Sequence, residues 1–208
     1  MKLFFIFTVC ENMEQHLILS NINRHISLNK EETDYFISLL EFKRLVKKDC
    51  LLKEGQNCKT ISYVHSGALR AFHQNKEGKE STIMFAAADW WITDMYCFIN
   101  QKPAMMYIEA IEDSCIFQLT KENFDQLLRS VTKFEKFFRI LMQNAYIREQ
   151  LRVLQNLSLP AEERYNNFLD KYPQLVQQIT QKQIASYLGI TPEFLSAIRK
   201  NKSKGNIS

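Results

Sequence analysis

The sequence predicts an α+β fold, in which a small β-rich domain precedes a long helix and a small helical domain. Three observations support this. Short apolar runs separated by glycine-containing turns recur between residues 51 and 119, which is typical of a small β-sandwich or barrel. Residues 122–156 contain neither proline nor glycine, which favours helical structure, including a long helix at residues 133–156. Two short helical segments then meet at Gly189.

The first residues resemble a short secretion signal, but no small-residue cleavage site follows them. The apolar run that ends at Cys10 is also too short to span a membrane. We therefore expect residues 1–12 to be an upstream extension, with Met13 as the functional start; a secretion signal is the alternative. The pattern from Met13 to Glu41 is helical, and Ser27 or Asn29 can cap its second helix.

The β-rich segment follows Phe42. We expect strands at residues 51–52, 61–64, 68–72, 81–85, 107–111 and 115–119, and a hairpin loop at residues 75–78. Helix returns at Lys121. A further helix is expected to start at residues 158–160 and to end near Lys171, because Pro173 stops it.

The long helix carries an apolar pattern that favours pairing with a second copy. Its predicted seam has spacings of three and four residues and consists of Phe137, Ile140, Asn144, Ile147, Leu151 and Leu154. A single asparagine in such a seam costs stability but specifies register and a two-stranded state, so we interpret Asn144 as a dimer specifier. A second apolar face is formed by Phe134, Phe138, Leu141 and Ala145. The alternative to pairing is a helix packed within its own domain.

The most specific pattern in the chain is a helix-turn-helix at residues 181–200. Such a unit needs a small residue at the helix crossing, a residue that tolerates positive φ at the turn, and apolar residues at fixed offsets. The sequence supplies Ala185, Gly189, Ile184, Leu188, Ile190, Leu195 and Ile198. Thr191 and Pro192 then suit the start of the second helix. The alternative is a pair of helices used only for packing.

In such a unit the N-terminal part of the second helix contacts base edges in the major groove. The predicted DNA-binding residues are Thr180, Gln181, Lys182, Thr191, Pro192, Glu193, Ser196, Arg199 and Lys200. Glu193 can accept a hydrogen bond from cytosine, whereas Lys182 and Arg199 suit phosphates. Between residues 179 and 208, five lysines and arginines stand against one glutamate, which suits a phosphate-facing surface; a solvated tail is the alternative.

Other classes of function lack support in the sequence. We find no nucleophile elbow, phosphate loop or H-E-x-x-H motif, so we do not expect an enzyme. The five cysteines are dispersed and the four histidines show no ligand pairing, so we expect neither a metal site nor a cofactor. An odd, dispersed cysteine set suggests reduced thiols in the cytoplasm.

The order of these segments resembles the Crp/Fnr family of transcription regulators, over residues 13–202. The residues that carry the resemblance are 52–55, 61–67, 87–89 and 107–110 in the β-rich part and 184–191 in the helix-turn-helix. The resemblance implies a double-stranded β-helix (jelly-roll) sensor, a homodimer and a near-palindromic duplex DNA target. RNA polymerase is a further expected partner, and no membrane association is expected. The expected division is residues 13–132 for the sensor, 133–156 for the dimerisation helix and 157–208 for the DNA-binding domain.

The family's cyclic-nucleotide pocket uses a Gly-Glu pair and an Arg followed by Ser or Thr. Thr93-Asp94 and Ala104-Met105 stand at these positions, and an alanine cannot neutralise a cyclic phosphate. We therefore expect a degenerate effector pocket at Trp90, Trp91, Thr93, Asp94, Ala104 and Met105, and no response to cyclic AMP. Large side chains here, including Tyr96, Phe98 and Met106, either fill the cavity or line a pocket for a less charged, unknown effector.

A second departure concerns base recognition. Family members often carry arginine, which reads guanine, at the position of Ala197. The sequence therefore predicts a DNA-binding regulator, with one alternative, namely a ligand-binding or protein-interaction module of the same fold with weakened DNA recognition. In the regulator, we expect changes near residues 90–106 to press on the long helix and to alter the spacing of the two recognition helices.

Overall fold

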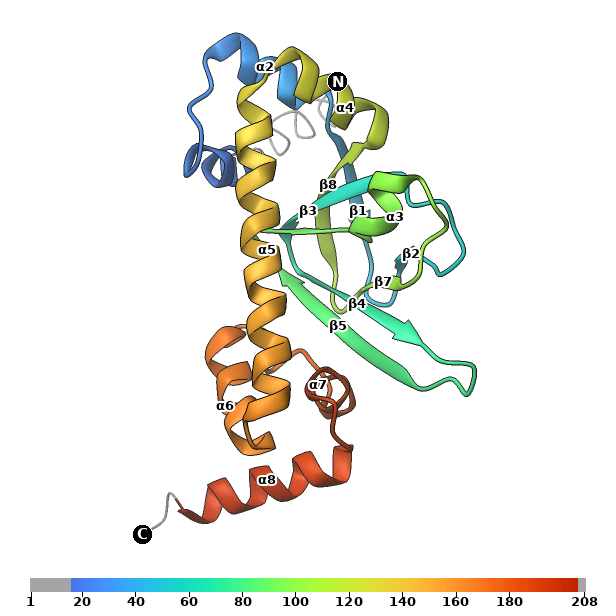
Figure 1. The fold of residues 1–208 in the computed structure, drawn as a ribbon, viewed down its shortest axis with the longest axis vertical. Coiled ribbons are helices and arrows are strands. Elements are labelled where there is room, and N and C mark those ends of the chain that lie inside the picture. The colour runs from blue at the N-terminus through green and yellow to red at the C-terminus, as the bar shows by residue number, and fades with distance from the viewer. Residues whose placement is uncertain (1–15, 206–208) are drawn as a thin grey trace, which may run out of the picture.

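The computed structural model describes residues 16–205, with side chains described through Asn201. It has the predicted α+β fold: two antiparallel four-stranded sheets, a long helix along one side of them, and a group of helices at the far end of that helix (Figure 1). The sheets have the strand orders β1-β8-β3-β6 and β2-β7-β4-β5. The expected extension at residues 1–12 and the expected start at Met13 lie outside the described residues.

The strands are β1 (Glu41–Leu45), β2 (Cys50–Leu52), β3 (Thr60–Ser66), β4 (Ala68–Gln74), β5 (Glu80–Ala87), β6 (Trp90–Ile92), β7 (Tyr107–Ala110) and β8 (Ser114–Thr120). The helices are α2 (Lys30–Ser38), α3 (Met95–Asn100), α4 (Lys121–Ser130), α5 (Lys133–Ser158), α6 (Ala161–Lys171), α7 (Gln181–Leu188) and α8 (Pro192–Gly205). Residues 16–23 are also helical.

All six expected strands are confirmed, but β1, β6 and α3 were not predicted. β1 is exposed at three of its five positions, so its own pattern indicates no strand; pairing with β8, from Glu41 opposite Gln118 to Leu45 opposite Ser114, decides it. β6 has only three residues and pairs with β3. α3 begins where the Asp94 side chain accepts a hydrogen bond from the Cys97 backbone N–H.

Local capping explains the helix ends that the sequence did predict. Asn29, one of the two candidate caps, starts α2 through a capping box in which Asn29 Oδ1 accepts from the Glu32 N–H and Glu32 Oε2 accepts from the Asn29 N–H, each at 2.8 Å. α6 follows Pro160 and ends at Lys171, as expected from Pro173. Side chain-to-backbone bonds at helix ends satisfy N–H groups that have no partner within the helix.

The β3–β4 turn needs glycine because two strands approach closely there. Gly67 has φ +82°, and a Cβ at this position would lie 2.3 Å from Ser114 Oγ and 2.5 Å from the Asp113 carbonyl oxygen. The same Ser114 Oγ accepts a hydrogen bond from the Ala68 N–H at 3.1 Å. A methyl group here would break the contact that holds β4 beside the start of β8.

Aromatic side chains join the N-terminal helices and the first half of α5 to the sandwich. The Phe36 ring stacks on Phe134 with centroids 4.9 Å apart, and Phe124 meets Phe138 edge-on at 4.7 Å. Phe138 also packs edge-on against Trp91 of β6 at 5.7 Å. Such rings bury large apolar areas and gain from edge-to-face geometry, so this end of α5 is part of the sensor core.

The prediction that Phe137 belongs to the dimer seam is wrong, because this part of α5 is buried in the sensor. Phe137 has no exposed surface, and its ring lies 6.0 Å from that of Trp91. It therefore cannot contact a second chain while the sensor is folded. The helical pattern alone does not show this, because Phe137 also falls on a three-and-four spacing. Further along the helix, Ile147, Leu151 and Leu154 are 51%, 52% and 59% exposed.

We predict that Phe137→Ala destabilises the sensor itself. Removing a fully buried phenylalanine leaves a cavity and lowers the free energy of unfolding by about 3–5 kcal/mol. Denaturant unfolding followed at several protein concentrations measures this, and the loss should not vary with concentration. Phe194→Ala, at a phenylalanine that is 53% exposed, is the control and should change stability by less than about 0.5 kcal/mol. Unchanged stability of the Phe137→Ala protein would contradict a core role for Phe137 and would favour its predicted place in the dimer seam.

Candidate functional site

α7 and α8 form the helix-turn-helix that the sequence predicts. Gly189 ends α7 with φ +68°, and the Ile190 N–H donates to the Ala185 carbonyl oxygen at 3.0 Å. Thr191 Oγ1 accepts from the Phe194 N–H at 3.2 Å and so caps α8. The shared core of the two helices is buried and consists of Ile184, Ala185, Leu188, Leu195 and Ile198.

The opposite face of this unit is exposed. All nine predicted DNA-binding residues are solvent-exposed: Thr180, Gln181, Lys182, Thr191, Pro192, Glu193, Ser196, Arg199 and Lys200. α8 lies at the end of the molecule, away from the sheets (Figure 1). Ser196 Oγ donates to the Pro192 carbonyl oxygen at 2.9 Å and lies 3.2 Å from Gln181 Oε1. The two helices therefore present Gln181 and Ser196 side by side.

Sequence reasoning missed one residue of this face. Phe194 is 53% exposed on the first turn of α8, next to the predicted base-reading residue Glu193. An aromatic side chain in a DNA groove can contact the methyl group of thymine. The sequence could have indicated this exposure. The helix-turn-helix pattern assigns Leu195 and Ile198 to the core, and the side chain of Phe194, one position before Leu195, points in a different direction around the helix.

The structure also shows a contact that no motif predicted: α7 docks on strand β5 of the sensor. The Ser186 hydroxyl accepts from the Thr82 N–H at 2.7 Å and donates to the Glu80 carbonyl oxygen at 2.9 Å. Beside it, the Phe85 ring of β5 lies 5.5 Å from Tyr187 and 5.9 Å from Phe168. The orientation of the helix-turn-helix is thus set by polar and aromatic contacts with the sensor.

Two of the residues expected in a degenerate effector pocket, Thr93 and Asp94, make hydrogen bonds within the chain itself. Asp94 is 1% exposed, with Oδ1 accepting from the Cys97 N–H at 3.3 Å and Oδ2 from the Met105 N–H at 2.8 Å. The Thr93 hydroxyl donates to the Thr60 carbonyl oxygen at 2.8 Å. Ala104 is 3% exposed and offers neither charge nor donor. The side chains at these positions therefore provide no cation to neutralise a cyclic phosphate.

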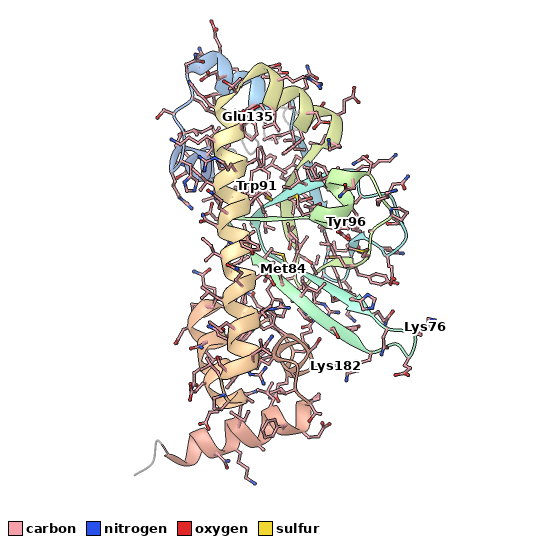
Figure 2. The ribbon with its side chains drawn as sticks, viewed as in Figure 1. Lys76, Met84, Trp91, Tyr96, Glu135 and Lys182 are labelled. Carbon is pink, nitrogen blue, oxygen red and sulfur yellow. The ribbon has the colours of Figure 1, made fainter. Side chains whose placement is uncertain are left out.

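The six predicted pocket residues do not share one cavity. Trp90, Trp91 and Thr93 line a cavity of about 420 Å³ bounded by β6, residues 21–25 and α5, whereas Asp94, Ala104 and Met105 are absent from its described lining. Met84 and Met95 also line this cavity. Two of its lining residues, Met84 and Trp91, are labelled in Figure 2. Most of its described walls are apolar or aromatic.

The expectation that large side chains fill the pocket is only partly right. Trp91 and Phe98 are buried, but Tyr96 and Met105 are 58% and 49% exposed and fill nothing. Trp90 lies on the outside of the sandwich, with its ring 5.8 Å from Tyr172 and 5.0 Å from the Arg148 guanidinium. Trp90 therefore connects β6 both to α5 and to the segment that follows α6.

The edge of this cavity is organised by Asp89, a residue with φ +74°. Its carboxylate accepts from Arg24 Nη1 at 2.6 Å, from Asn21 Nδ2 at 2.8 Å and from the Tyr63 hydroxyl at 2.8 Å. Burial and the bond to Asp89 raise the pKa of Tyr63, so this hydroxyl stays a donor at neutral pH. The left-handed turn is thereby held against its own strain.

Burial also bears on thiol chemistry. Cys58 is 2% exposed, and burial raises the pKa of its thiol. Such a thiol stays protonated at neutral pH and is a poor nucleophile.

The described residues contain no group of three or more His, Cys, Asp or Glu side chains placed to hold a metal ion. None of the helices in the described range combines the length and apolar content that a membrane crossing requires.

Residues 42–131 match the family model described as "Cyclic nucleotide-binding domain". Along nearly its whole length the chain is similar to regulatory proteins. The fumarate and nitrate reduction regulatory protein of Vibrio cholerae is 24% identical over 205 residues, which cover 93% of this chain and 81% of that protein. Electron transport regulator A of Shewanella oneidensis is 23% identical over 186 residues, which cover 83% and 73%.

Solved structures share the fold. FixK2 of Bradyrhizobium japonicum has a TM-score of 0.72 at 15% identity, with 81% of this chain and 86% of that one covered. A transcriptional regulator of the crp/fnr family from Eubacterium rectale has a TM-score of 0.69 at 19% identity, with 86% and 85% covered. The similarity therefore extends through both the sheets and the C-terminal helices.

We predict that Ser186→Ala loosens the contact between α7 and β5. The substitution leaves the partly buried Thr82 N–H without an acceptor, which costs about 1–3 kcal/mol. Hydrogen exchange at the Thr82 amide should accelerate correspondingly. Ser196→Ala is the matched control, because its hydroxyl is exposed and bonds only within the helix-turn-helix. Equal protection of Thr82 in the Ser186→Ala protein would refute the docking role.

Proposed function

We propose that this chain, a member of the Crp/Fnr family of transcription regulators, binds near-palindromic duplex DNA as a homodimer and does not respond to cyclic AMP. The observation that carries DNA binding is α8, whose buried side rests on α7 while Glu193, Ser196 and Arg199 face solvent. This is the arrangement by which a recognition helix enters the major groove. Residues 157–208 are the proposed DNA-binding part.

Charge supports the same face. Lys182 is exposed on the first turn of α7, and Arg199 on α8, where both can neutralise phosphates that flank the groove. Base reading then falls to Gln181, Glu193, Ser196 and the exposed Phe194. Gln181 and Ser196 lie within contact distance of each other, so they act on neighbouring bases rather than independently.

Homodimer formation is supported by an apolar stripe on the second half of α5. Its described members include Ile147, Leu151, Leu154 and Leu157, the last of which is 81% exposed. Four large apolar side chains exposed along one helix form a continuous apolar surface, which is typical of a protein interaction site. We retain Ile140 and Asn144 as proposed seam residues; Asn144 is exposed and also borders the cavity near Trp91, which puts it at the edge of the stripe.

Lack of response to cyclic AMP is supported by Asp94 and Ala104. Ala104, at the expected position of the arginine, offers a cyclic phosphate no cation, and both carboxylate oxygens of Asp94 already accept from the Cys97 and Met105 N–H groups. We propose instead that any effector binds in the apolar cavity beside Trp90 and Trp91. From there, Trp90 passes a displacement to Arg148 of α5 and to Tyr172, and so to the DNA-binding part.

One observation favours the alternative of a module with weakened DNA recognition. Ala197 is exposed in the middle of α8, so a position that often carries a guanine-reading arginine contributes no base contact. Selection of bound duplexes from a random pool, by the protein and by an Ala197→Arg variant, separates the two functions. A regulator selects a consensus with two half-sites, whereas a module without DNA recognition selects none until arginine is introduced.

We predict that Lys182→Gln weakens binding to the selected duplex and to scrambled DNA alike. Loss of one phosphate contact should reduce the slope of log K against log salt concentration by about 0.9. Glu193→Gln should instead change base preference, by about 1–3 kcal/mol at one position of the site. A salt series with labelled duplexes measures both.

Lys76→Gln, at the tip of the β4–β5 hairpin and far from α8, is the control for charge (Figure 2). Its slope should equal that of the unaltered protein. An unchanged slope for Lys182→Gln, or the same negligible affinity for every duplex at low salt, contradicts the proposed interface.

We predict that Leu154→Glu converts the dimer to a monomer. A charge placed in an apolar helix seam is desolvated without a partner, which weakens association by several orders of magnitude. Sedimentation velocity measures the oligomeric state of the variant and of the unaltered protein. Val46→Glu is the matched control, since Val46 is 61% exposed and Leu154 59%, but Val46 follows strand β1 on the sensor. Dimers of unchanged affinity in the Leu154→Glu protein would contradict the seam.

A further inference from the structure

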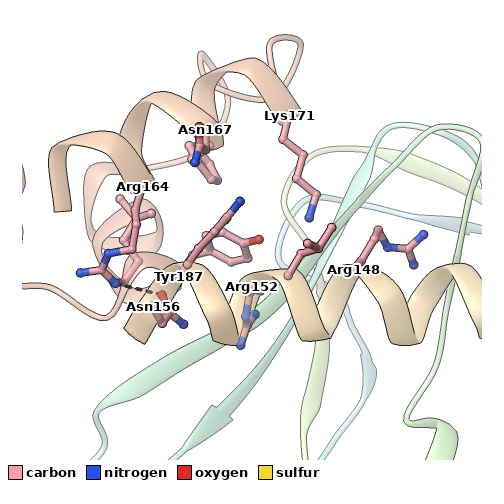
Figure 3. A pocket seen from close by; sticks show the side chains of 11 residues that line it. Arg148, Arg152, Asn156, Arg164, Asn167, Lys171 and Tyr187 are labelled. Carbon is pink, nitrogen blue, oxygen red and sulfur yellow. Dashed lines mark hydrogen bonds between the residues drawn. The ribbon is translucent and has the colours of Figure 1, made fainter. Parts of the chain in front are cut away.

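A positively charged cavity of about 170 Å³ lies where α5, α6 and α7 meet, and neither the DNA-facing surface nor the dimer stripe accounts for its charge (Figure 3). Four of its described lining residues are cationic: Arg148 and Arg152 of α5, and Arg164 and Lys171 of α6. None of the described lining residues is acidic. The side-chain amides of Asn156 and Asn167 border it as well.

Two of these cations have unused hydrogen-bond donors. The Nε atoms of Arg152 and Arg164 are buried, and the described residues provide no hydrogen-bond acceptor for either. A carboxylate oxygen of Glu149 lies 3.6 Å from Arg152 Nε, which is too long for a hydrogen bond. An unsatisfied buried donor on a charged group is costly, so an acceptor supplied from outside the chain would be favoured.

Other bonds already hold both guanidinium groups in place. Arg152 Nη1 donates to the Ile83 carbonyl oxygen of β5, and its guanidinium lies 5.2 Å from the Tyr187 ring centroid. Arg164 Nη1 donates to the Leu188 carbonyl oxygen at 2.6 Å and to Asn156 Oδ1 at 2.9 Å. These side chains are therefore preorganised, and little rotamer entropy remains to be lost when a ligand binds.

The four cationic side chains repel one another in the free protein, and the ion pair between Glu149 and Arg152, at 3.6 Å, offsets only part of this repulsion. Arg148 and Arg152 are one turn apart on α5, and like charges at this spacing destabilise a helix. Arg164 and Lys171 add two more positive charges from the opposite wall. A ligand with more than one negative charge would remove this repulsion, and guanidinium groups match the geometry of phosphate oxygens.

The size of the cavity limits the kind of ligand that it can bind. Its volume is below the about 300–1,000 Å³ of sites for drug-sized molecules, so it suits a compact anion. We propose that this cavity binds a small polyanion bearing phosphate groups, of the size of pyrophosphate. The bound anion bridges Arg152 of α5 and Arg164 of α6. Because Arg164 also donates to the Leu188 carbonyl oxygen of α7, the anion clamps both α6 and α7 to the long helix.

The ligand would act on the geometry of the molecule through Arg152. This side chain contacts β5 of the sensor, lies beside Tyr187 of α7 and belongs to α5. An anion that immobilises it strengthens the contact among these three elements at once. Binding of the anion does not depend on the proposed DNA-binding function, because the cavity is formed within one chain.

Isothermal titration calorimetry of the full chain with pyrophosphate, without DNA, tests the proposal. We expect saturable binding of one pyrophosphate per chain. Lys171→Gln should weaken it by at least about tenfold, the loss of one charge-assisted contact. The Lys171 amine lies 5.1 Å from the Tyr172 ring centroid and its side chain is exposed, so this substitution should leave the fold intact.

Arg148→Gln provides a second variant, from the opposite wall, with the same expected direction. Lys76→Gln at the hairpin tip is the matched control and should bind pyrophosphate as the unaltered protein does (Figure 2). Absence of saturable binding at millimolar pyrophosphate would overturn the proposal, as would an equal loss of affinity in the Lys76→Gln protein. Neither result depends on whether the chain binds DNA.

Discussion

The aromatic contact between Phe85 and the C-terminal helices is the constraint on which the rest of the molecule depends. Phe85 is fully buried, although it lies on a strand of the sensor, because Phe168, Tyr172 and Tyr187 cover it. Without this cover, β5 would expose a large apolar surface to water. The same contact fixes where α7 sits, and α7 fixes α8. The direction in which α8 presents its polar face is therefore set by packing on the sensor.

α5 performs two different tasks along its length. Its first turns bury Phe134, Phe137 and Phe138 in the sensor core, whereas its later turns leave Leu151 and Leu154 half-exposed. One rigid helix thus joins the cavity beside Trp91 to the stripe that a partner would cover. Because a continuous helix transmits rotation and translation over its length, a small displacement near the sensor moves the far end as well. Arg148 and Arg152 lie along the same length of α5 as the stripe and contact Trp90 and Tyr187, respectively; Arg148 also lines the cavity.

Local chemistry was predictable from the sequence wherever it depends on neighbouring residues. The cap at Asn29, the end of α6 at Lys171 and the left-handed turn at Gly189 all follow from side chains within a few positions. β1 was not predictable, because a mostly exposed strand is specified by its partner β8 rather than by its own pattern. The large side chains near Asp94 could be placed in one segment but not in one cavity, since α3 turns Tyr96 outward.

The sequence by itself determined that a helix-turn-helix exists and that its second helix starts at Pro192. These features rest on the identity and spacing of adjacent residues. Only the tertiary structure decided that Phe137 faces the core, that Ser186 bonds to β5, and that cations from α5 and α6 meet around one cavity. Such contacts join residues far apart in the chain, and helical periodicity specifies a face without specifying what covers it.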